Sequence, residues 1–282
     1  MPVSPSSSVQ AARKAVAERL REIRHDAGLS GADLAASAGW YKSKVSRLEN
    51  AVTPPSDADI RAWCAACGAE DRAPDLIASS RSADSMHVEW WRLQRTGLAR
   101  LQASKVPLYE RTRTFRVYCS NVVPGLLQTD GYARALLGSI SAFRRLPNDV
   151  DEAVAARMDR SRVIREGDHR FALLVEEGVL RHRIGGPEVM AGQLGYLLSV
   201  MALPSVSLGV IPFTADRRMW GLETFSLFDE EQASVELLTA RVTVTAPSEV
   251  GQYLRAFSKF SKLAVYGAGA RACITAAIDA LE

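Results

Sequence analysis

The residues with the clearest chemical use lie close together between positions 41 and 50. Five of them can donate hydrogen bonds: Lys42, Ser43, Lys44, Ser46 and Arg47. Val45 and Leu48 are apolar and three residues apart, which is typical of the buried side of a short helix and leaves the donors on its outer side. A helix of this width fits the major groove of DNA, where such side chains can reach base edges and phosphates.

Other pairs of reactive residues imitate known sites. Cys64 and Cys67 have the Cys-x-x-Cys spacing of a redox site, which requires a helix N-terminus in a βαβ unit. We instead expect both cysteines in the middle of a helix, facing its core. A zinc site would need a second cysteine pair or a close pair of histidines, and the sequence has neither.

A glycine-containing segment near the end of the sequence, 267–272, imitates a dinucleotide-binding loop. Too few residues follow it in the sequence for the second strand that such a site needs, so we expect a turn between helices. The four histidines are scattered, and Glu176 and Glu177 would point to opposite faces of a strand. Lysine is too scarce after residue 105 to favour Ser–Lys self-cleavage. The sequence therefore predicts no enzyme, no cofactor and no metal.

The elements that must position the donors are helices. Val16, Leu20, Ile23 and Ala27 form one apolar stripe of a helix over residues 9–26, which Gly28 would end. The second helix is expected to begin at Ser30 as N-cap, with Asp33 as the acid of a capping box, and to stop at Gly39. The third covers 41–50, the fourth runs from Ser56 to Gly68, and a short fifth covers 71–80.

Charge divides the sequence in the same place. The 282 residues have a formal net charge of +3, and residues 1–50 hold eight basic and five acidic side chains. The remainder holds 27 of each, so the whole excess lies in the first fifth, as expected of a module that meets a polyanion. Residues 81–118 add a local patch of eight basic and three acidic residues that would suit the DNA backbone or an acidic partner.

Composition and the change in apolar pattern along the sequence predict two domains in a cytoplasmic protein. The sequence shows neither a run of apolar residues long enough for a membrane span nor a secretory h-region, and its four cysteines form no disulfide framework. We expect a disordered tail over 1–8, an all-α domain over 9–82, and a larger α+β domain with a mixed or antiparallel sheet over 88–282.

The second domain is expected to alternate strands and helices. The predicted strands are 113–120, 171–176 and 206–212, followed by a meander at 225–228, 235–238 and 242–245. The predicted helices cover 90–101, 129–137, 149–166, 188–203, 247–265 and 271–281.

The first domain resembles the Xre-type helix-turn-helix of phage repressors and bacterial regulators. The matching positions are Leu20-Arg21, Arg24, Gly28-Leu29-Ser30, Leu34-Ala35, Gly39, Ser46-Arg47 and Glu49. Two departures are Gly31, where the family usually has Gln, and Ala51, where it usually has Gly.

This resemblance implies a role for each polar residue of the motif. Lys42, Ser43 and Arg47 would face DNA bases. Five residues would lie near phosphates: Ser30, Tyr41, Lys44, Ser46 and Asn50. Arg24 and Glu49 would form a structural ion pair between the first helix and the end of the third.

The larger domain resembles the one that follows Xre-type modules in actinomycete regulators. The match is carried by Val122–Thr129, Tyr132-Ala133-Arg134, Glu177–Arg181, Gly185–Met190, Gln193-Leu194, Val210–Phe213 and Thr224–Leu227. Together the two parts resemble the streptomycete antitoxin-like regulators, whose genes often lie beside that of a small partner protein.

The sequence thus predicts a DNA-binding transcription regulator, in particular a repressor that binds a double-stranded operator as a homodimer. The second domain would provide dimerisation and would sense a partner or a small-molecule effector. One alternative is an antitoxin-like protein whose main role is to bind a small neighbouring-gene partner. Another is an enzyme with an attached DNA-binding module, against which the missing catalytic residues argue.

Overall fold

The computed structural model describes residues 5–82, 87–89, 97–221 and 223–281. The chain divides into two compact units, residues 1–87 with 243–250 and residues 88–242 with 251–282. The domain predicted over 88–282 is therefore interrupted, because residues 243–250 group with the first unit. No helix of the described ranges is long and apolar enough to cross a membrane.

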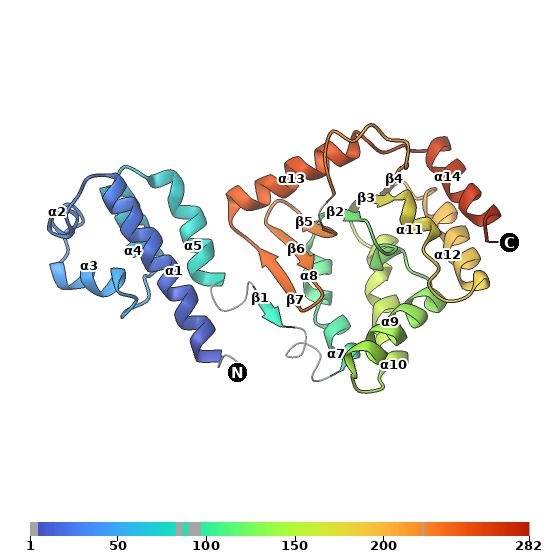
Figure 1. Ribbon diagram of the computed structural model, residues 1–282, viewed down its shortest axis with the longest axis horizontal. Coiled ribbons are helices and arrows are strands. Elements are labelled where there is room, and N and C mark those ends of the chain that lie inside the picture. The colour runs from blue at the N-terminus through green and yellow to red at the C-terminus, as the bar shows by residue number, and fades with distance from the viewer. Residues whose placement is uncertain (1–4, 83–86, 90–96, 222, 282) are drawn as a thin grey trace. The chain divides into compact units, whose positions relative to one another are not determined.

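The first unit consists of helices (Figure 1). They are α1 (Pro5–Asp26), α2 (Gly31–Ser37), α3 (Lys42–Glu49), α4 (Asp57–Ala66), the 3-10 helix η1 (Glu70–Arg72) and α5 (Ala73–Ser82). The disordered tail predicted over 1–8 is wrong for residues 5–8, which lie in α1. Proline is tolerated in the first helical turn, where a backbone N–H has no helical partner.

The core of this unit joins α1, α2, α3 and α4. Leu20, Leu34, Leu48 and Ile60 are fully buried around Trp63. The Trp63 indole Nε1 donates a hydrogen bond of 3.0 Å to the Leu20 carbonyl, which fixes α4 against α1. Because buried polar groups need partners, this bond lets a tryptophan occupy the centre of the core.

The second unit combines helices with a sheet. Its strands are β1 (His87–Glu89), β2 (Thr114–Cys119), β3 (Arg170–Glu176), β4 (Val206–Ile211), β5 (Phe225–Phe228), β6 (Gln232–Glu236) and β7 (Ala240–Val244). Its helices up to β3 are α7 (Leu98–Ala103), α8 (Val106–Arg111), η2 (Gly125–Leu127), α9 (Asp130–Arg144), α10 (Val150–Arg160) and η3 (Ser161–Ile164). The later ones are α11 (Glu177–Arg181), α12 (Pro187–Val200), α13 (Pro247–Ser261) and α14 (Ala268–Asp279). β1, β7 and α13 each include residues that group with the first unit.

The sheet is mixed, in the order β1-β7-β6-β5-β2-β3-β4. β3 pairs in parallel with β2 and β4, while β5 pairs antiparallel with β2 and β6. This confirms the predicted α+β class. The meander was placed correctly only at 225–228, because β6 and β7 begin before the predicted 235 and 242.

Helices pack on both faces of the sheet. Phe115, Leu173 and Val210 lie in one apolar cluster with residues of α12 and α14, among them Leu194 and Ile274. On the opposite face, the ring of Tyr118 stacks on that of Phe260 in α13, with centroids 4.1 Å apart. Alternate residues of β2 thus point into different layers, as strand geometry requires.

Several smaller predictions need correction. Glu177 does not belong to a strand with Glu176, since it begins α11. Cys64 is buried in α4 as predicted, but Cys67 is the half-buried residue that caps its end. Of the helix predicted over 90–101, residues 90–96 lie outside the described residues, and α7 covers only Leu98–Ala103. The turn between helices predicted over 267–272 is wrong for 268–272, which form the first residues of α14, and only Gly267 precedes that helix.

Candidate DNA-binding surface

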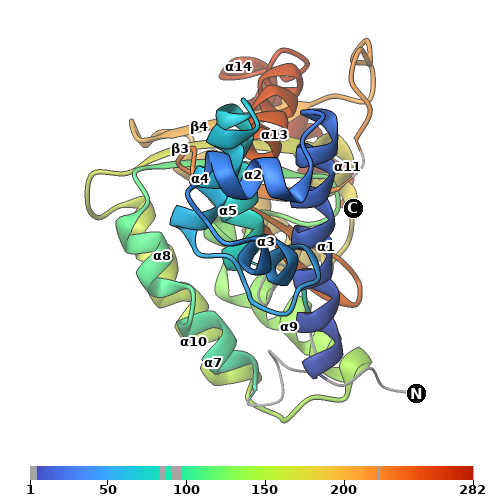
Figure 2. The ribbon, with the colours of Figure 1, turned by 90° about the vertical axis from the view of Figure 1, so that its left-hand side faces the viewer.

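The helix-turn-helix is formed by α2 and α3, which pack on each other, with α3 also against α1 (Figure 2). The turn between them has Gly39 at φ 67°, a left-handed conformation that favours glycine. Leu34 and Ala35 of α2 are buried, as are Val45 and Leu48 of α3. The two helices therefore form one packed body.

A capping box holds the start of α2. The Asp33 backbone N–H donates to Ser30 Oγ at 3.2 Å, and the Asp33 carboxylate accepts from the Ser30 backbone N–H at 3.0 Å. Hydrogen bonds from the Ser30 side chain and backbone lower the pKa of Asp33. Ser30, predicted to lie near phosphate, has its hydroxyl engaged in this cap.

The outer side of α3 carries the residues predicted to read bases. Lys42, Ser43 and Arg47 are all exposed, opposite the buried Val45 and Leu48. Ser43 and Arg47 are four residues apart and share one face, with Lys42 at its edge. The arrangement presents an ammonium, a hydroxyl and a guanidinium group from a single rigid helix.

The end of α3 is anchored to α1 by two arginines. Arg24 Nε donates to the Glu49 carboxylate at 2.7 Å, and both side chains are nearly buried. Arg24 Nη1 also donates to the Leu29 carbonyl at 2.7 Å. Sequence reasoning missed Arg21, whose Nη2 donates to the Glu49 carbonyl at 2.7 Å and to Asn50 Oδ1 at 3.4 Å. These bonds satisfy groups at the helix end that lack helical partners.

Lys44 is held within the fold. Its Nζ lies 2.5 Å from Asp59 Oδ1 and 4.1 Å from the centroid of the Trp40 ring. Burial acts to raise the pKa of Asp59, but hydrogen bonds from Lys44 and Ser56 outweigh it and lower that pKa. Lys44 is thus a half-buried ion-pair partner of α4, and no local feature of the sequence indicates this contact.

The remaining predicted phosphate contacts lie around α3. Tyr41, the residue before the helix, has 86 % of its surface exposed. Asn50 donates to the Ser46 carbonyl at 2.8 Å and to Ser46 Oγ at 3.3 Å. Ser46 and Asn50 are exposed and form one polar end of the helix.

The departure at Ala51 has a structural consequence. Ala51 has φ 54°, and its N–H donates to the Leu48 carbonyl at 3.2 Å. The Val52 N–H donates to the Arg47 carbonyl at 2.9 Å. This pair of bonds is a Schellman motif, in which glycine is the preferred residue at the left-handed position.

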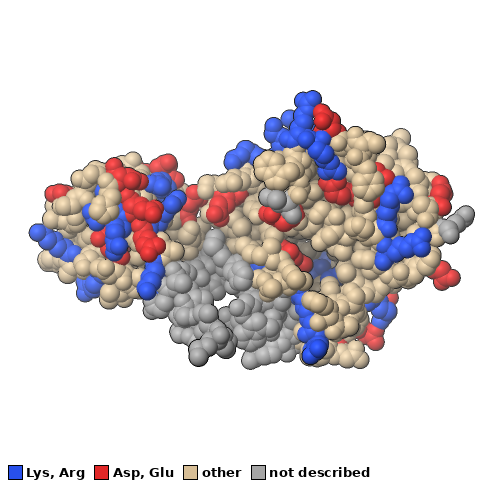
Figure 3. Space-filling view, viewed as in Figure 1, with Lys and Arg blue, Asp and Glu red and all other residues tan. Residues whose placement is uncertain are grey.

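Acidic side chains also appear on this unit. On the face shown in Figure 3, red acidic groups stand among blue basic ones over the helices. Within the described residues, Glu49 is paired with Arg24, Asp59 with Lys44, and Asp57 with Arg81. Pairing lowers the repulsion that these carboxylates would exert on a polyanion.

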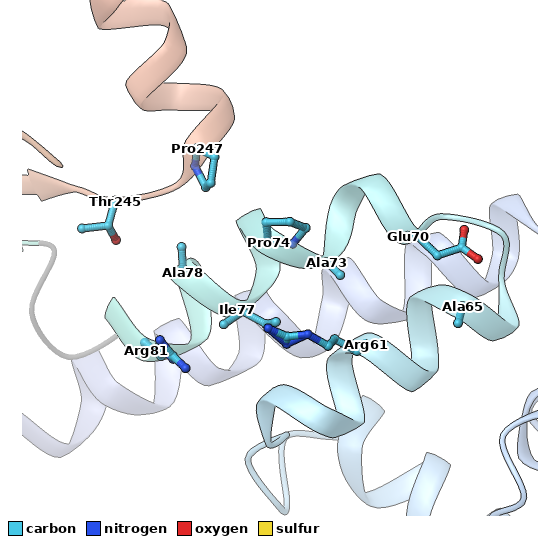
Figure 4. A pocket seen from close by; sticks show the side chains of 10 residues that line it. All are labelled: Arg61, Ala65, Glu70, Ala73, Pro74, Ile77, Ala78, Arg81, Thr245 and Pro247. Carbon is cyan, nitrogen blue, oxygen red and sulfur yellow. The ribbon is translucent and has the colours of Figure 1, made fainter. Parts of the chain in front are cut away.

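An open hollow of about 780 Å³ lies elsewhere in the first unit. It is lined by Arg61, Ala65, Glu70, Ala73, Pro74, Ile77, Ala78, Arg81, Thr245 and Pro247 (Figure 4). None of the residues predicted to contact DNA lines it.

The cysteine pair and the Glu176 carboxylate each have a physical explanation. Burial raises the pKa of the Cys64 thiol to about 11 and also raises that of Cys67, so neither favours the reactive thiolate. The Glu176 carboxylate binds Arg217 at 2.6 Å and accepts from the Tyr118 hydroxyl at 2.9 Å. In the described part of the chain, no three His, Cys, Asp or Glu side chains group to hold a metal ion.

Comparison with known families agrees with this geometry. Residues 15–76 match the model of a helix-turn-helix domain. Residues 106–276 match the model of a domain of unknown function, DUF5753. No curated protein and no solved structure matches the chain. Since the second match covers more than half of its length, the chain belongs to the DUF5753 family, with a helix-turn-helix domain preceding the family's own domain.

Proposed function

We propose that this protein is a sequence-specific transcription regulator that reads the major groove of double-stranded DNA with α3. The helix-turn-helix match indicates a DNA-binding regulator. The observation that carries the finer assignment is the exposure of Lys42, Ser43 and Arg47 on one side of a helix whose other side is buried. An arginine in this position can donate two hydrogen bonds to a guanine, which is the commonest specific contact in the major groove.

The proposed regulator is a repressor that works as a homodimer. One α3 reads only a few base pairs, so two copies would be needed to specify an operator. We assign dimerisation, and the sensing of a small partner protein or effector, to the second unit. In this proposal the protein is cytoplasmic and catalyses no reaction.

The test starts by selecting bound sequences from random DNA with the full chain. Arg47→Ala should then weaken binding to the selected operator by about 1–3 kcal/mol in a mobility-shift titration. Arg162→Ala is the matched control, since it removes an exposed arginine from the second unit. Equal affinities of Arg47→Ala and the unmodified protein for the operator would contradict base reading by this residue.

A further inference from the structure

The second unit buries two arginine side chains one helical turn apart. Arg157 and Arg160 lie near the end of α10 and are only 9 % and 4 % exposed. Positions three apart lie on the same side of a helix, so two positive charges enter the same region of the interior. Buried charges are costly unless they are compensated, so their partners matter.

The partners that these guanidinium groups find are neutral. Gln102 Oε1 accepts from Arg157 Nε at 3.2 Å and from Arg160 Nη1 at 2.8 Å. Gln128 Oε1 accepts from Arg157 Nη1 at 2.5 Å. The ring of Tyr109 lies 4.7 Å from the Arg160 guanidinium carbon. Amide oxygens and a ring face thus stand where a carboxylate would be expected.

The nearby carboxylate is already engaged. The negative charge of Glu236 favours the charged form of Arg157. However, Glu236 Oε1 already forms an ion pair with Lys105 Nζ, at a distance of 3.1 Å. Burial, followed by the positive charge of Arg160, lowers the pKa of Arg157 to about 10. Among the residues whose contacts the structure describes, the two arginines therefore keep an excess of about two positive charges.

One donor of the pair, Arg160 Nε, has no partner among the described residues, and there is room beside Nη2 on the same edge of that guanidinium group. Arg160 Nε is buried and makes no hydrogen bond within the described residues. A Cβ added at Gly125 would lie 3.6 Å from Arg160 Nη2 and within 4 Å of no other atom beyond the adjoining residues of the chain, so there is room for a methyl group beside Nη2. Gln128, the partner of Arg157, also lines a cavity of about 150 Å³, and neither Arg157 nor Arg160 is among the residues that line it.

We propose that Arg157 and Arg160 form the binding site for a small phosphate-type dianion. An excess of two positive charges complements a dianion, and the Nε and Nη2 edge of a guanidinium group is suited to a bidentate contact with phosphate oxygens. Gln102 and Gln128 would position the two arginines in the absence of the anion. The inference goes beyond DNA binding and does not depend on it.

The test measures thermal unfolding of the full chain in sodium phosphate against sodium chloride of equal ionic strength. Phosphate also stabilises proteins by general exclusion from their surface, so the relevant quantity is the difference between variants. The unmodified protein should gain about 2–4 °C more than Arg160→Met when phosphate is roughly fourfold above its Kd. Arg271→Met, which removes an exposed arginine of α14, is the matched control and should respond like the unmodified protein.

Two further variants keep the result decisive. If Arg160→Met does not fold, Gly125→Ala leaves both arginines in place, fills the space beside Nη2 and should reduce the phosphate response. Arg47→Ala should keep the full response, which separates this site from the DNA-binding surface. The proposal would be overturned if Arg160→Met, or Gly125→Ala in its place, responded to phosphate as strongly as the unmodified protein. It would also be overturned if Arg47→Ala lost the response, or if acetate stabilised the unmodified protein as much as phosphate does.

Discussion

At the scale of single residues, the basic side chains of α3 divide into two kinds. Lys42 and Arg47 are exposed on the outer side of the helix. Lys44 lies on the flank nearer the core, where Asp59 and the Trp40 ring hold its ammonium group. A pattern of charges along a sequence does not distinguish these cases, because the partner of Lys44 comes from another helix.

This division predicts how Asp59 titrates. In Lys44→Met, burial continues to act on the Asp59 carboxyl while the stabilising ammonium is lost, so its pKa should rise. The lowered pKa makes Asp59 stabilise the folded state above its unfolded pKa, and this contribution is lost as pH falls through the folded pKa. Lys44→Met should therefore be less stable near neutral pH, and its stability should fall less on acidification.

Carboxyl NMR titration of Asp59, together with urea unfolding at neutral and acidic pH, measures both effects. Lys42→Met is the control, because Lys42 does not act on Asp59. An unchanged pKa of Asp59 in Lys44→Met would refute the pairing. DNA binding by Lys44→Met gives a further measurement. The slope of the logarithm of its DNA-binding constant against the logarithm of salt concentration should be smaller than that of the unmodified protein, by about 1, only if Lys44 also contacts a phosphate.

At the scale of elements, the ends of the helices explain much of what the sequence could predict. Ser30 and Ser56 begin α2 and α4 with capping boxes, and Gly28 follows α1 with φ 68°. These signals are local, so the sequence is sufficient to read them. The pair of Arg24 and Glu49 could be named only through a family resemblance, because 25 residues separate its members.

The sheet was less predictable for the opposite reason. The positions of β6 and β7 depend on pairing across the sheet, and β5 pairs with both β2 and β6. The turn from β5 contains Asp229 at φ 53°, and its carboxylate accepts from the Thr114 N–H at 2.8 Å. A contact across 115 residues leaves no local trace, so the strand boundaries could not be placed from periodicity alone.

The end of α3 gives a prediction at this scale. Ala51→Gly should stabilise the protein by about 0.5–1 kcal/mol, because glycine adopts the left-handed conformation of Ala51 without the cost imposed by a Cβ. Urea unfolding of the full chain, followed by circular dichroism, gives the change. Ala36→Gly is the control of opposite sign, since it places glycine inside α2. A loss of stability in Ala51→Gly would contradict the strain argument.

At the scale of the whole molecule, the proposed regulator must combine two short reading helices. α3 spans only eight residues, Lys42–Glu49, and presents few base-reading side chains. Two copies related by a two-fold axis would read the same half-site in opposite directions. The selected operator is therefore expected to be palindromic.

Sequencing of the DNA that the full chain selects from random sequence tests this expectation. Two inverted half-sites should appear, with centres about 34–36 Å apart, or one turn of DNA. Light scattering with chromatography should give a dimer both free and on this DNA. Inserting half a turn between the half-sites should abolish tight binding, because it places one half-site on the opposite face of the duplex. Selection of a single, non-repeated site by a monomer would refute the dimeric arrangement while leaving the assignment of α3 to be decided by Arg47→Ala.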